Sequence, residues 1–289
     1  MLGALEAGGT KMVLAAADDE MHIVDRITVP TLTPADTVPV LIDWLKQRHI
    51  EALGVGSFGP LDLNPQSPTY GFITQTPKLA WRDYPLMPTL LNALHVPGMI
   101  DTDVNAAALC EAEAGAAKGL KNCVYVTIGT GIGAGVYCEG NLVHGLMHPE
   151  WGHMPLRPHP DDPMPLGVCP YHESCLEGLA SGPAMEKRWG VSARDLPDGH
   201  PGWRIEAHYL AQLCVTALMT VSPEKILLGG GVMHRQSLFP LIQKETERLL
   251  NGYLPCAKDL DALICPPGRW PDSGLIGSLL LARRALNKR

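Results

Sequence analysis

The stretch Cys123-Val-Tyr-Val-Thr-Ile-Gly-Thr-Gly-Ile-Gly-Ala-Gly-Val-Tyr-Cys138 decides the fold. A β-branched apolar run fills 123–128, glycine-rich sequence fills 129–135, and an apolar segment continues through 136–138. Apolar runs separated by glycine predict a strand, a turn and a returning strand. The same device opens the chain, where Leu2–Glu6 and Lys11–Ala17 flank Ala-Gly-Gly-Thr. We therefore predict an internal repeat.

Apolar runs typical of strands alternate along the chain with segments that have the apolar spacing of helices. Further strands are predicted at Ile23–Val29, Ala52–Ser57, Gly98–Thr102 and Lys225–Leu228. Helices are predicted at Pro34–Arg48 with Thr33 as N-cap, Leu86–Leu94, Asp103–Leu109, Pro183–Arg188, Arg204–Val221, Leu238–Leu250 and Gly274–Leu286. This alternation predicts an α/β fold.

Composition excludes several classes of protein. Of 289 residues, 46% are apolar, and 23 Lys and Arg against 30 Asp and Glu give a net charge of −7. That balance argues against a broad nucleic-acid surface. No apolar run approaches a membrane span, and the N-terminus lacks the basic start of a signal peptide. Among the eight cysteines only Cys169 and Cys175 show paired spacing, so we expect a reduced, cytoplasmic protein.

Four residues of the type that binds zinc cluster in a short stretch. They are His153, Cys169, His172 and Cys175. The last three are spaced as Cys-x2-His-x2-Cys. Thiolates and imidazoles are preferred zinc ligands, and four of them complete a tetrahedral shell with no position for a reactive water. We therefore predict a structural zinc site; the alternative is unrelated residues in a Pro-rich loop.

Glycine-rich turns follow apolar runs at three places: Gly8-Gly9-Thr10, Gly129–Gly135 and Gly229–Gly231. Glycine allows the backbone to approach a ligand and direct N–H groups at phosphate oxygens. Neither a P-loop nor a well-formed Gly-x-Gly-x-x-Gly motif is present. Three such turns favour a bound nucleotide over simple hairpins. Lys11 could face a phosphate or be an outward charge.

Asp101-Thr-Asp103-Val-Asn105 lies at a predicted strand-to-helix junction. Asp103 could cap the helix or accept a proton as a general base, and the neighbouring motifs favour the base. Asn105, Glu150, His153 and Glu177 together offer the donors and acceptors that a polyol requires. We expect His148, His159, Asp161 and Asp162 to be solvated loop residues.

Several motifs together resemble the ROK family (repressors, open reading frames, kinases). They are Glu6-Ala-Gly-Gly-Thr-Lys11, Asp103-Val-Asn-Ala-Ala-Ala-Leu109, Gly129-Thr-Gly-Ile-Gly-Ala-Gly135, Glu150-Trp-Gly-His153 and Leu228-Gly-Gly-Gly-Val232. The stretch from Cys169 to Pro183 is similar to the zinc-containing bacterial fructokinases of that family. Glu6 departs from the family pattern, which usually has Asp there, and Cys110 stands where Gly is usual.

The resemblance implies an actin-like ATPase (ribonuclease H-like) fold, duplicated into two domains. The smaller lobe would comprise residues 1–116 with 272–289. The larger lobe, 117–271, would carry the zinc loop and the adenine side of the ATP site. It also implies ATP with Mg²⁺, a hexose and a homodimer. The absence of a nucleic-acid or membrane partner is expected from the charge balance and the lack of long apolar runs.

The resemblance assigns roles by position. Asp103 would be the catalytic base, and the sugar would lie near Asn105, Glu150, His153 and Glu177. Zinc would be bound by His153, Cys169, His172 and Cys175. ATP would be surrounded by Gly9, Thr10, Lys11, Thr130, Gly131, Pro183, Gly229, Gly230 and Gly231.

We expect phosphoryl transfer from ATP to a hexose, with fructose preferred and mannose or glucose as alternatives. The rivals are a sugar-responsive repressor and a sugar sensor without activity. A repressor of this family carries an N-terminal helix-turn-helix segment, and we expect none because the first predicted strand starts at Leu2. The predicted base and the three glycine turns argue against the sensor.

Overall fold

The computed structural model describes residues 1–255 and 257–288, which form two compact units. Unit 1 comprises Met1–Gly115, Leu142–Pro149 and Pro271–Arg289, and unit 2 comprises Ala116–Asn141 and Glu150–Trp270. Leu142–Pro149 thus belongs to unit 1, although unit 2 precedes and follows it in sequence. Among the described residues, no helix combines the length and apolar character that crossing a bilayer requires.

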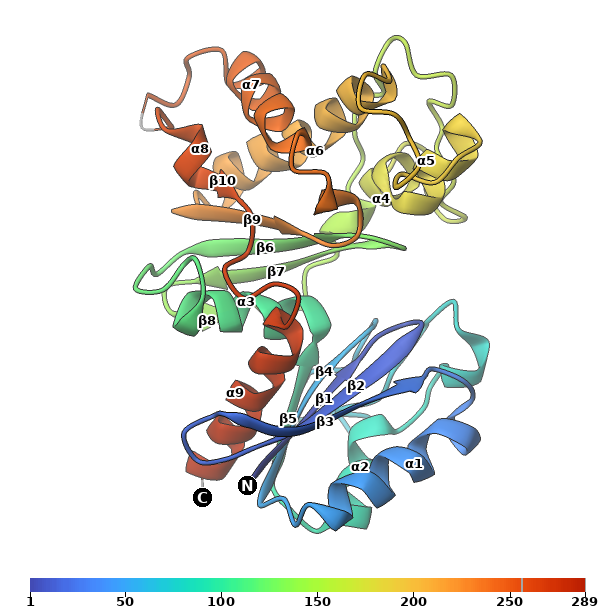
Figure 1. Ribbon diagram of the computed structural model, residues 1–289, viewed down its shortest axis with the longest axis vertical. Helices are drawn as coiled ribbons and strands as arrows, with labels where there is room; N and C mark the ends of the chain where they lie inside the picture. Colours follow the sequence, from blue (N-terminus) through green and yellow to red (C-terminus); the bar gives the residue numbers. More distant parts are fainter. Residues whose placement is uncertain (256, 289) are drawn as a thin grey trace. The chain divides into compact units, whose positions relative to one another are not determined.

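Unit 1 is built from the elements at the two ends of the chain (Figure 1). Its strands are β1 (Leu2–Ala7), β2 (Lys11–Ala17), β3 (Ile23–Pro30), β4 (Ala52–Ser57) and β5 (Gly98–Thr102). Its helices are α1 (Pro34–Gln47), the 3-10 turn η1 (Leu79–Trp81), α2 (Leu86–Leu94), α3 (Asp103–Ala114) and α9 (Ser273–Asn287).

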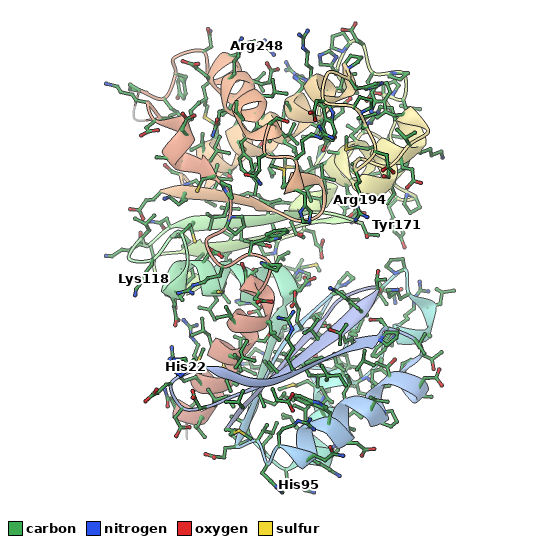
Figure 2. The ribbon with its side chains drawn as sticks, viewed as in Figure 1. His22, His95, Lys118, Tyr171, Arg194 and Arg248 are labelled. Atoms are coloured by element: carbon green, nitrogen blue, oxygen red, sulfur yellow. The ribbon has the colours of Figure 1, made fainter. Side chains whose placement is uncertain are left out.

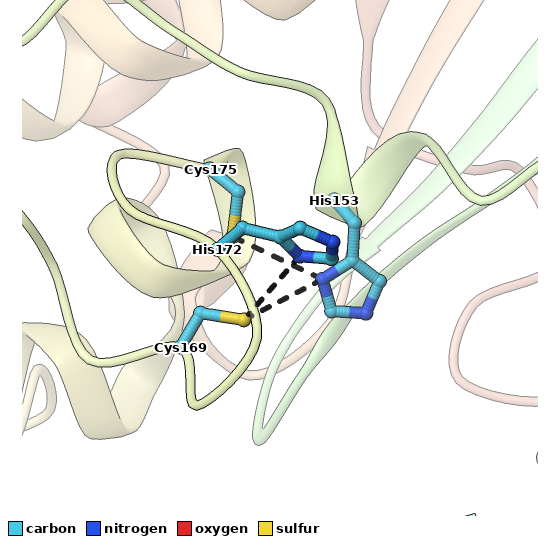
Figure 3. Close-up of side chains that lie close together, drawn as sticks. All are labelled: His153, Cys169, His172 and Cys175. Carbon is cyan, nitrogen blue, oxygen red and sulfur yellow. Dashed lines mark hydrogen bonds between the residues drawn. The ribbon is translucent and has the colours of Figure 1, made fainter. Parts of the chain in front are cut away.

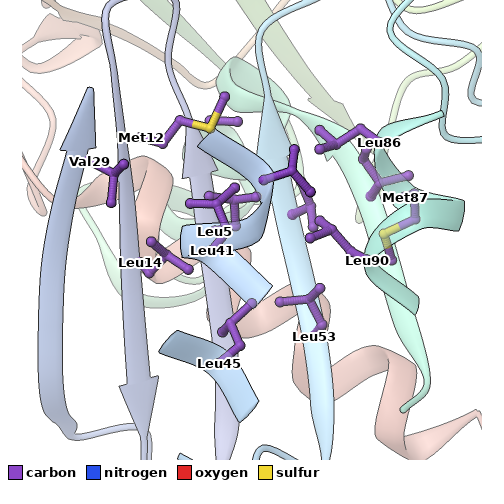
Figure 4. Packing of buried hydrophobic residues seen from close by; sticks show 14 of the residues in the cluster. Leu5, Met12, Leu14, Val29, Leu41, Leu45, Leu53, Leu86, Met87 and Leu90 are labelled. Atoms are coloured by element: carbon purple, nitrogen blue, oxygen red, sulfur yellow. The ribbon is translucent and has the colours of Figure 1, made fainter. Parts of the chain in front are cut away.

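The described strands of unit 1 form one sheet in the order β3-β2-β1-β4-β5. β1 pairs antiparallel with β2 and parallel with β4, and β5 extends the parallel side. Leu5, Leu14 and Leu53 on one face pack against Leu41 of α1 and Leu90 of α2 (Figure 4). Because β1, β4 and β5 run parallel, their carboxyl ends lie at the same edge of the sheet.

The opposite face of this sheet carries small residues that allow helix α9 to lie close to it. Ala4, Ala15 and Ala52 pack with Leu275 and Leu279 of α9. A Cβ on Gly54 of β4 would overlap the main chain of Ser278, and one on Gly277 would overlap that of Ala106 in α3. The glycines are therefore required for α9 to contact both β4 and α3, and this fixes the position of α3.

Unit 2 is built from the middle of the chain. Its strands are β6 (Cys123–Ile128), β7 (Ile132–Cys138), β9 (Lys225–Gly229) and β10 (Ile264–Cys265), and its sheet also includes the short β8 (Asn141–Leu142). Its helices are η2 (Trp151–His153), α4 (Leu176–Ala180), α5 (Gly182–Trp189), α6 (Gly202–Thr220), η3 (Val232–His234), α7 (Leu238–Leu250) and α8 (Leu260–Leu263).

The second sheet repeats the topology of the first. Its order over the described residues is β10-β9-β6-β7-β8, in which β6 pairs antiparallel with β7 and parallel with β9. β6, β7 and β9 thus correspond to β1, β2 and β4 of unit 1. The predicted repeat is confirmed, and it extends beyond the glycine hairpin to the neighbouring parallel strand.

The predicted elements are confirmed, most with small shifts of their ends, while α3 continues to Ala114, beyond the predicted Leu109. One difference affects the site: the second glycine turn is shorter than the run of glycine suggested. Strand β7 already begins at Ile132, so only Gly129–Gly131 form the turn. Gly133 and Gly135 pair with Thr127 and Tyr125 across the sheet instead.

Candidate functional site

Asp103 is the first residue of helix α3, directly after strand β5 ends. The N-cap is Thr102, whose hydroxyl oxygen accepts the N–H of Asn105 at 3.1 Å. The capping role considered for Asp103 therefore belongs to Thr102. The Asp103 carboxylate is partly buried and accepts the N–H of Val104 at 2.9 Å. Burial raises its pKa, as suits a group that must take a proton.

Three donors converge on Asp101, the buried residue two positions before the predicted base. Its Oδ1 accepts the N–H of Thr102 at 2.8 Å and the side-chain amide of Asn105 at 2.7 Å. Its Oδ2 lies 2.9 Å from Nε2 of His144. The hydrogen bond with Asp101 raises the pKa of His144, which favours its charged form. Segment Leu142–Pro149 is thereby joined to the start of α3.

Glu6 lies near the end of strand β1 in unit 1 and is partly buried. Burial raises its pKa to about 7, and the negative charge of Asp103 acts in the same direction. The main chain then turns tightly, because the N–H of Gly8 donates to the carbonyl of Lys11 at 3.0 Å. Lys78 crosses this turn, with its Cε 3.1 Å from the position a Cβ of Gly9 would take.

The glycine-rich segments of unit 2 adjoin one another. The N–H of Gly182, at the start of α5, donates to the carbonyl of Gly129 at 2.8 Å. A Cβ on Gly129 would lie 3.9 Å from the main-chain nitrogen of Gly231. Gly230 has φ +91°, and a Cβ there would lie 2.5 Å from the main chain of Ile128. Only glycine fits this approach, and the combined turns with a helix N-terminus suit an anion.

Glu177 lies next to the second of these turns. A Cβ on Gly131 would come within 2.7 Å of its Oε2, so the turn closes onto the carboxylate. Glu150 immediately precedes η2, and its carbonyl accepts the N–H of His153 at 3.0 Å. Two of the predicted sugar ligands of unit 2 are therefore attached directly to the predicted metal loop.

The four predicted metal ligands come together in unit 2 (Figure 3). Cys169 Sγ lies 3.8 Å from Nδ1 of His153 and 3.7 Å from Nδ1 of His172, and Cys175 Sγ lies 3.9 Å from Nδ1 of His153. All four ligand atoms are within 4.8 Å of one another. Tetrahedral zinc with bonds of about 2.3 Å to sulfur and 2.0 Å to nitrogen separates its ligands by roughly 3.3–3.8 Å. The donor set and spacing fit zinc.

Helix α4 begins at this cluster. Cys175 is its N-cap, and its Sγ accepts the N–H of Gly178 at 3.4 Å. Burial raises the pKa of the Cys175 thiol to about 11, so a nearby cation is needed to hold it as thiolate. Tyr171, in the loop between the ligands, is exposed (Figure 2). Through Cys175, the cluster therefore fixes the start of α4.

The predicted site residues are divided between the units. Gly9, Thr10, Lys11, Asp103 and Asn105 lie in unit 1. The others lie in unit 2: Thr130, Gly131, Glu150, His153, Cys169, His172, Cys175, Glu177, Pro183, Gly229, Gly230 and Gly231.

The sequence did not single out Asp101, His144 or Lys78 by function. Asp101 could have been found from its position two residues before the predicted base. His144 and Lys78 are distant in sequence from Asp103, and no local pattern indicated them. The prediction that His148 and Asp162 are solvated is wrong, because both are buried.

These two residues are buried because each meets specific partners. His148 Nε2 accepts the N–H of Leu61 at 3.1 Å. Asp162 pairs with Arg188 at 2.8 Å and accepts the hydroxyl of Tyr209. Polar sequence predicted exposure, whereas these partners come from segments distant in sequence.

Comparisons with known proteins identify the family of this chain. The family model described as "ROK family" matches residues 2–285, so the chain belongs to the ROK family. A relative from Bacillus subtilis (strain 168), provisionally named a fructokinase, is 48% identical over 99% of this chain and 96% of its own length. The fructokinase of Pediococcus pentosaceus is 44% identical over 99% of each chain.

Among solved structures, the ROK hexokinase from Thermus thermophilus has a TM-score of 0.81 and is 27% identical. The match covers 100% of this chain and 99% of that one. The chain therefore has the duplicated α/β fold of the ROK sugar kinases, as the motifs predicted.

Proposed function

We propose that this protein is an ATP-dependent fructokinase that converts D-fructose and ATP to D-fructose 6-phosphate and ADP. The observation that carries the proposal is Asp103, a partly buried carboxylate with a raised pKa at the start of α3. The fructokinase names of full-length relatives at 48% and 44% identity support fructose as the acceptor.

In the reaction, the 6-hydroxyl oxygen of fructose attacks the γ-phosphorus of ATP. The bond between that phosphorus and the oxygen that bridges the β- and γ-phosphates breaks at the same time. Asp103 accepts the hydroxyl proton, and ADP leaves with the bridging oxygen. Desolvation supports this role because a carboxylate with a raised pKa is a better proton acceptor. Alignment and charge stabilisation provide most of the remaining acceleration.

We assign the nucleotide phosphates to the glycine turns. In unit 2 the residues are Thr130, Gly131, Pro183, Gly229, Gly230 and Gly231, and in unit 1 they are Gly9, Thr10 and Lys11. Main-chain N–H groups at such turns bind phosphate oxygens, and the start of α5 adds a helix N-terminus. Mg²⁺ bound with ATP would offset part of the negative charge of the phosphates.

We assign the sugar hydroxyls to Asn105, Glu150 and Glu177, and we place His153 near the sugar without a direct contact. We assign a structural zinc ion to His153, Cys169, His172 and Cys175, whose spacing fits a tetrahedral site. His153 then influences the sugar through the loop that it anchors. The homodimer and the cytoplasmic location stay predictions.

The test is the steady-state kcat/KM of the purified protein with Mg²⁺-ATP across fructose, mannose and glucose. ADP release is coupled to a readout, and the product is identified by ³¹P NMR. We expect fructose to exceed the other hexoses by at least tenfold and the product to be the 6-phosphate. A preference for mannose or glucose would make the protein another hexokinase of the family, and no hexose-dependent ADP release would contradict kinase activity.

A further inference from the structure

We infer that Asp101 and His144 are positioning residues that set the amide of Asn105 as a hydrogen-bond acceptor for one sugar hydroxyl. The inference rests on the proposed sugar-kinase activity. It explains why the Asn105 amide has one orientation. It also predicts that this amide binds ligand groups that donate a hydrogen bond.

The orientation of Asn105 follows from its partner. Asn105 is fully buried, and its nitrogen Nδ2 lies 2.7 Å from Oδ1 of Asp101. A carboxylate only accepts hydrogen bonds, so the amide must turn its NH₂ group toward Asp101. The amide oxygen Oδ1 therefore points away from Asp101 and offers lone pairs only.

The amide oxygen of Asn105 is buried and has no hydrogen-bond partner among residues 1–255 and 257–288. Leaving a buried acceptor unsatisfied costs about 1–3 kcal/mol. A hydroxyl of the bound sugar would supply the donor. A fluorine atom at the same position could not, because it has no hydrogen to donate.

His144 fixes the second oxygen of Asp101. Its Nε2 lies 2.9 Å from Oδ2 of Asp101 and 3.5 Å from Nδ2 of Asn105. The side chain of Asp101 is 6% exposed and that of His144 is 38% exposed, so the histidine forms the outer end of the pair. With the N–H of Thr102 on Oδ1, the carboxylate of Asp101 is held from both oxygens. It therefore cannot rotate to release Asn105.

The first test replaces Asp101. Asp101→Ala removes the acceptor, and we expect the KM for fructose to rise at least tenfold while kcat and the KM for ATP change less than threefold. Asp101→Asn keeps an oxygen for both Thr102 and Asn105, and we expect its KM for fructose within threefold of wild type. Equal KM values for the two variants, or a parallel rise in the KM for ATP, would overturn the positioning role.

Fructose analogues with fluorine in place of one hydroxyl at carbon 1, 3 or 4 give a sharper readout. In the wild type, we expect fluorine at one position to raise KM at least tenfold, because Asn105 offers only an acceptor. In Asp101→Ala the amide can rotate and offer N–H, so the penalty at that position should fall below threefold. A penalty unchanged in the variant would overturn the inference.

His144 is partly exposed, so replacing it leaves no cavity in the hydrophobic core. We expect His144→Leu to raise the KM for fructose about fivefold and His144→Gln, which keeps an N–H donor, to restore it. His208→Leu is the matched control, since His208 pairs with Glu245 at 2.7 Å in unit 2 and should leave the KM unchanged. Unchanged KM in His144→Leu would overturn the role of this residue.

Failure of the proposed function gives a different result. If the wild type phosphorylates another hexose instead of fructose, the fluorinated series is built on that hexose, and the same comparison decides the inference. If fructose is phosphorylated and the penalty persists in Asp101→Ala, the positioning role alone fails.

Discussion

Oε2 of Glu177 accepts the main-chain N–H of Ile132 at 2.9 Å, and this bond joins helix α4 to the glycine turn 129–131. Cys175 caps the same helix and belongs to the four-residue cluster of predicted zinc ligands. One short helix therefore connects the metal cluster to a turn that we assign to phosphate. The metal would act on catalysis through this connection without touching substrate.

Removal of zinc tests that connection. We expect one zinc ion per chain by mass spectrometry. Chelation should lower activity at least tenfold and increase protease cleavage between 153 and 175, because the ligands no longer fix α4. Cys169→Ser should reproduce both effects. Full activity in protein shown to be free of zinc would show that the metal does not support catalysis.

Gly131→Ala tests the turn itself. Its Cβ would lie 2.7 Å from Oε2 of Glu177, so either the carboxylate or the turn must shift and the bond to Ile132 is lost. We expect the KM for ATP to rise about tenfold, in line with the loss of one or two hydrogen bonds. Gly199→Ala is the control, because no atom lies within 4 Å of its added Cβ. Equal KM values for the two variants would contradict the role of the turn.

Much of this site could be predicted from sequence because its signals are local. Each signal lies within a short stretch of sequence. These signals are the glycine turns, the Cys-x2-His-x2-Cys spacing and the position of Asp103 at a strand-to-helix junction. His144 could not be predicted, since its role depends on segment Leu142–Pro149 packing in unit 1. The burial of Asp162 also depends on distant partners. The length of the second glycine turn was missed because glycines at 133 and 135 enter the strand.

Glu6 should give the protein a pH-dependent stability. Its pKa in the folded chain is about 7, above the ordinary 4.5, so the folded state holds a proton that the unfolded state releases. Stability from this group is present below pH 4.5 and is lost as pH rises to about 7. Relative to Glu6→Gln, the wild type should lose up to about 3 kcal/mol of unfolding free energy between pH 4.5 and 8.

The measurement is denaturant unfolding of both proteins at several pH values without divalent cations. Wild-type and Glu6→Gln curves that run parallel across this range would contradict the raised pKa of Glu6.

Arg188→Met should destabilise unit 2 strongly. Arg188 and Asp162 pair at 2.8 Å with side chains 1% and 0% exposed, and Arg188 also donates to the carbonyl of Leu179 at 2.8 Å. Removing one partner leaves a buried charge, so we expect unfolding free energy to fall by about 3–5 kcal/mol. Adding Asp162→Asn should recover part of this loss. Strictly additive losses in the double variant would show that the pair is not coupled.

The most direct test of the account is turnover by Asp103→Asn. The variant keeps the shape of the side chain but cannot accept the hydroxyl proton, so kcat with fructose should fall by about 10²–10⁴. Calorimetry should find fructose and ATP binding within about threefold of wild type, since Asn105 and the glycine turns are unchanged. A variant that binds both substrates and still turns over within a few-fold of wild type would show that Asp103 is not the base.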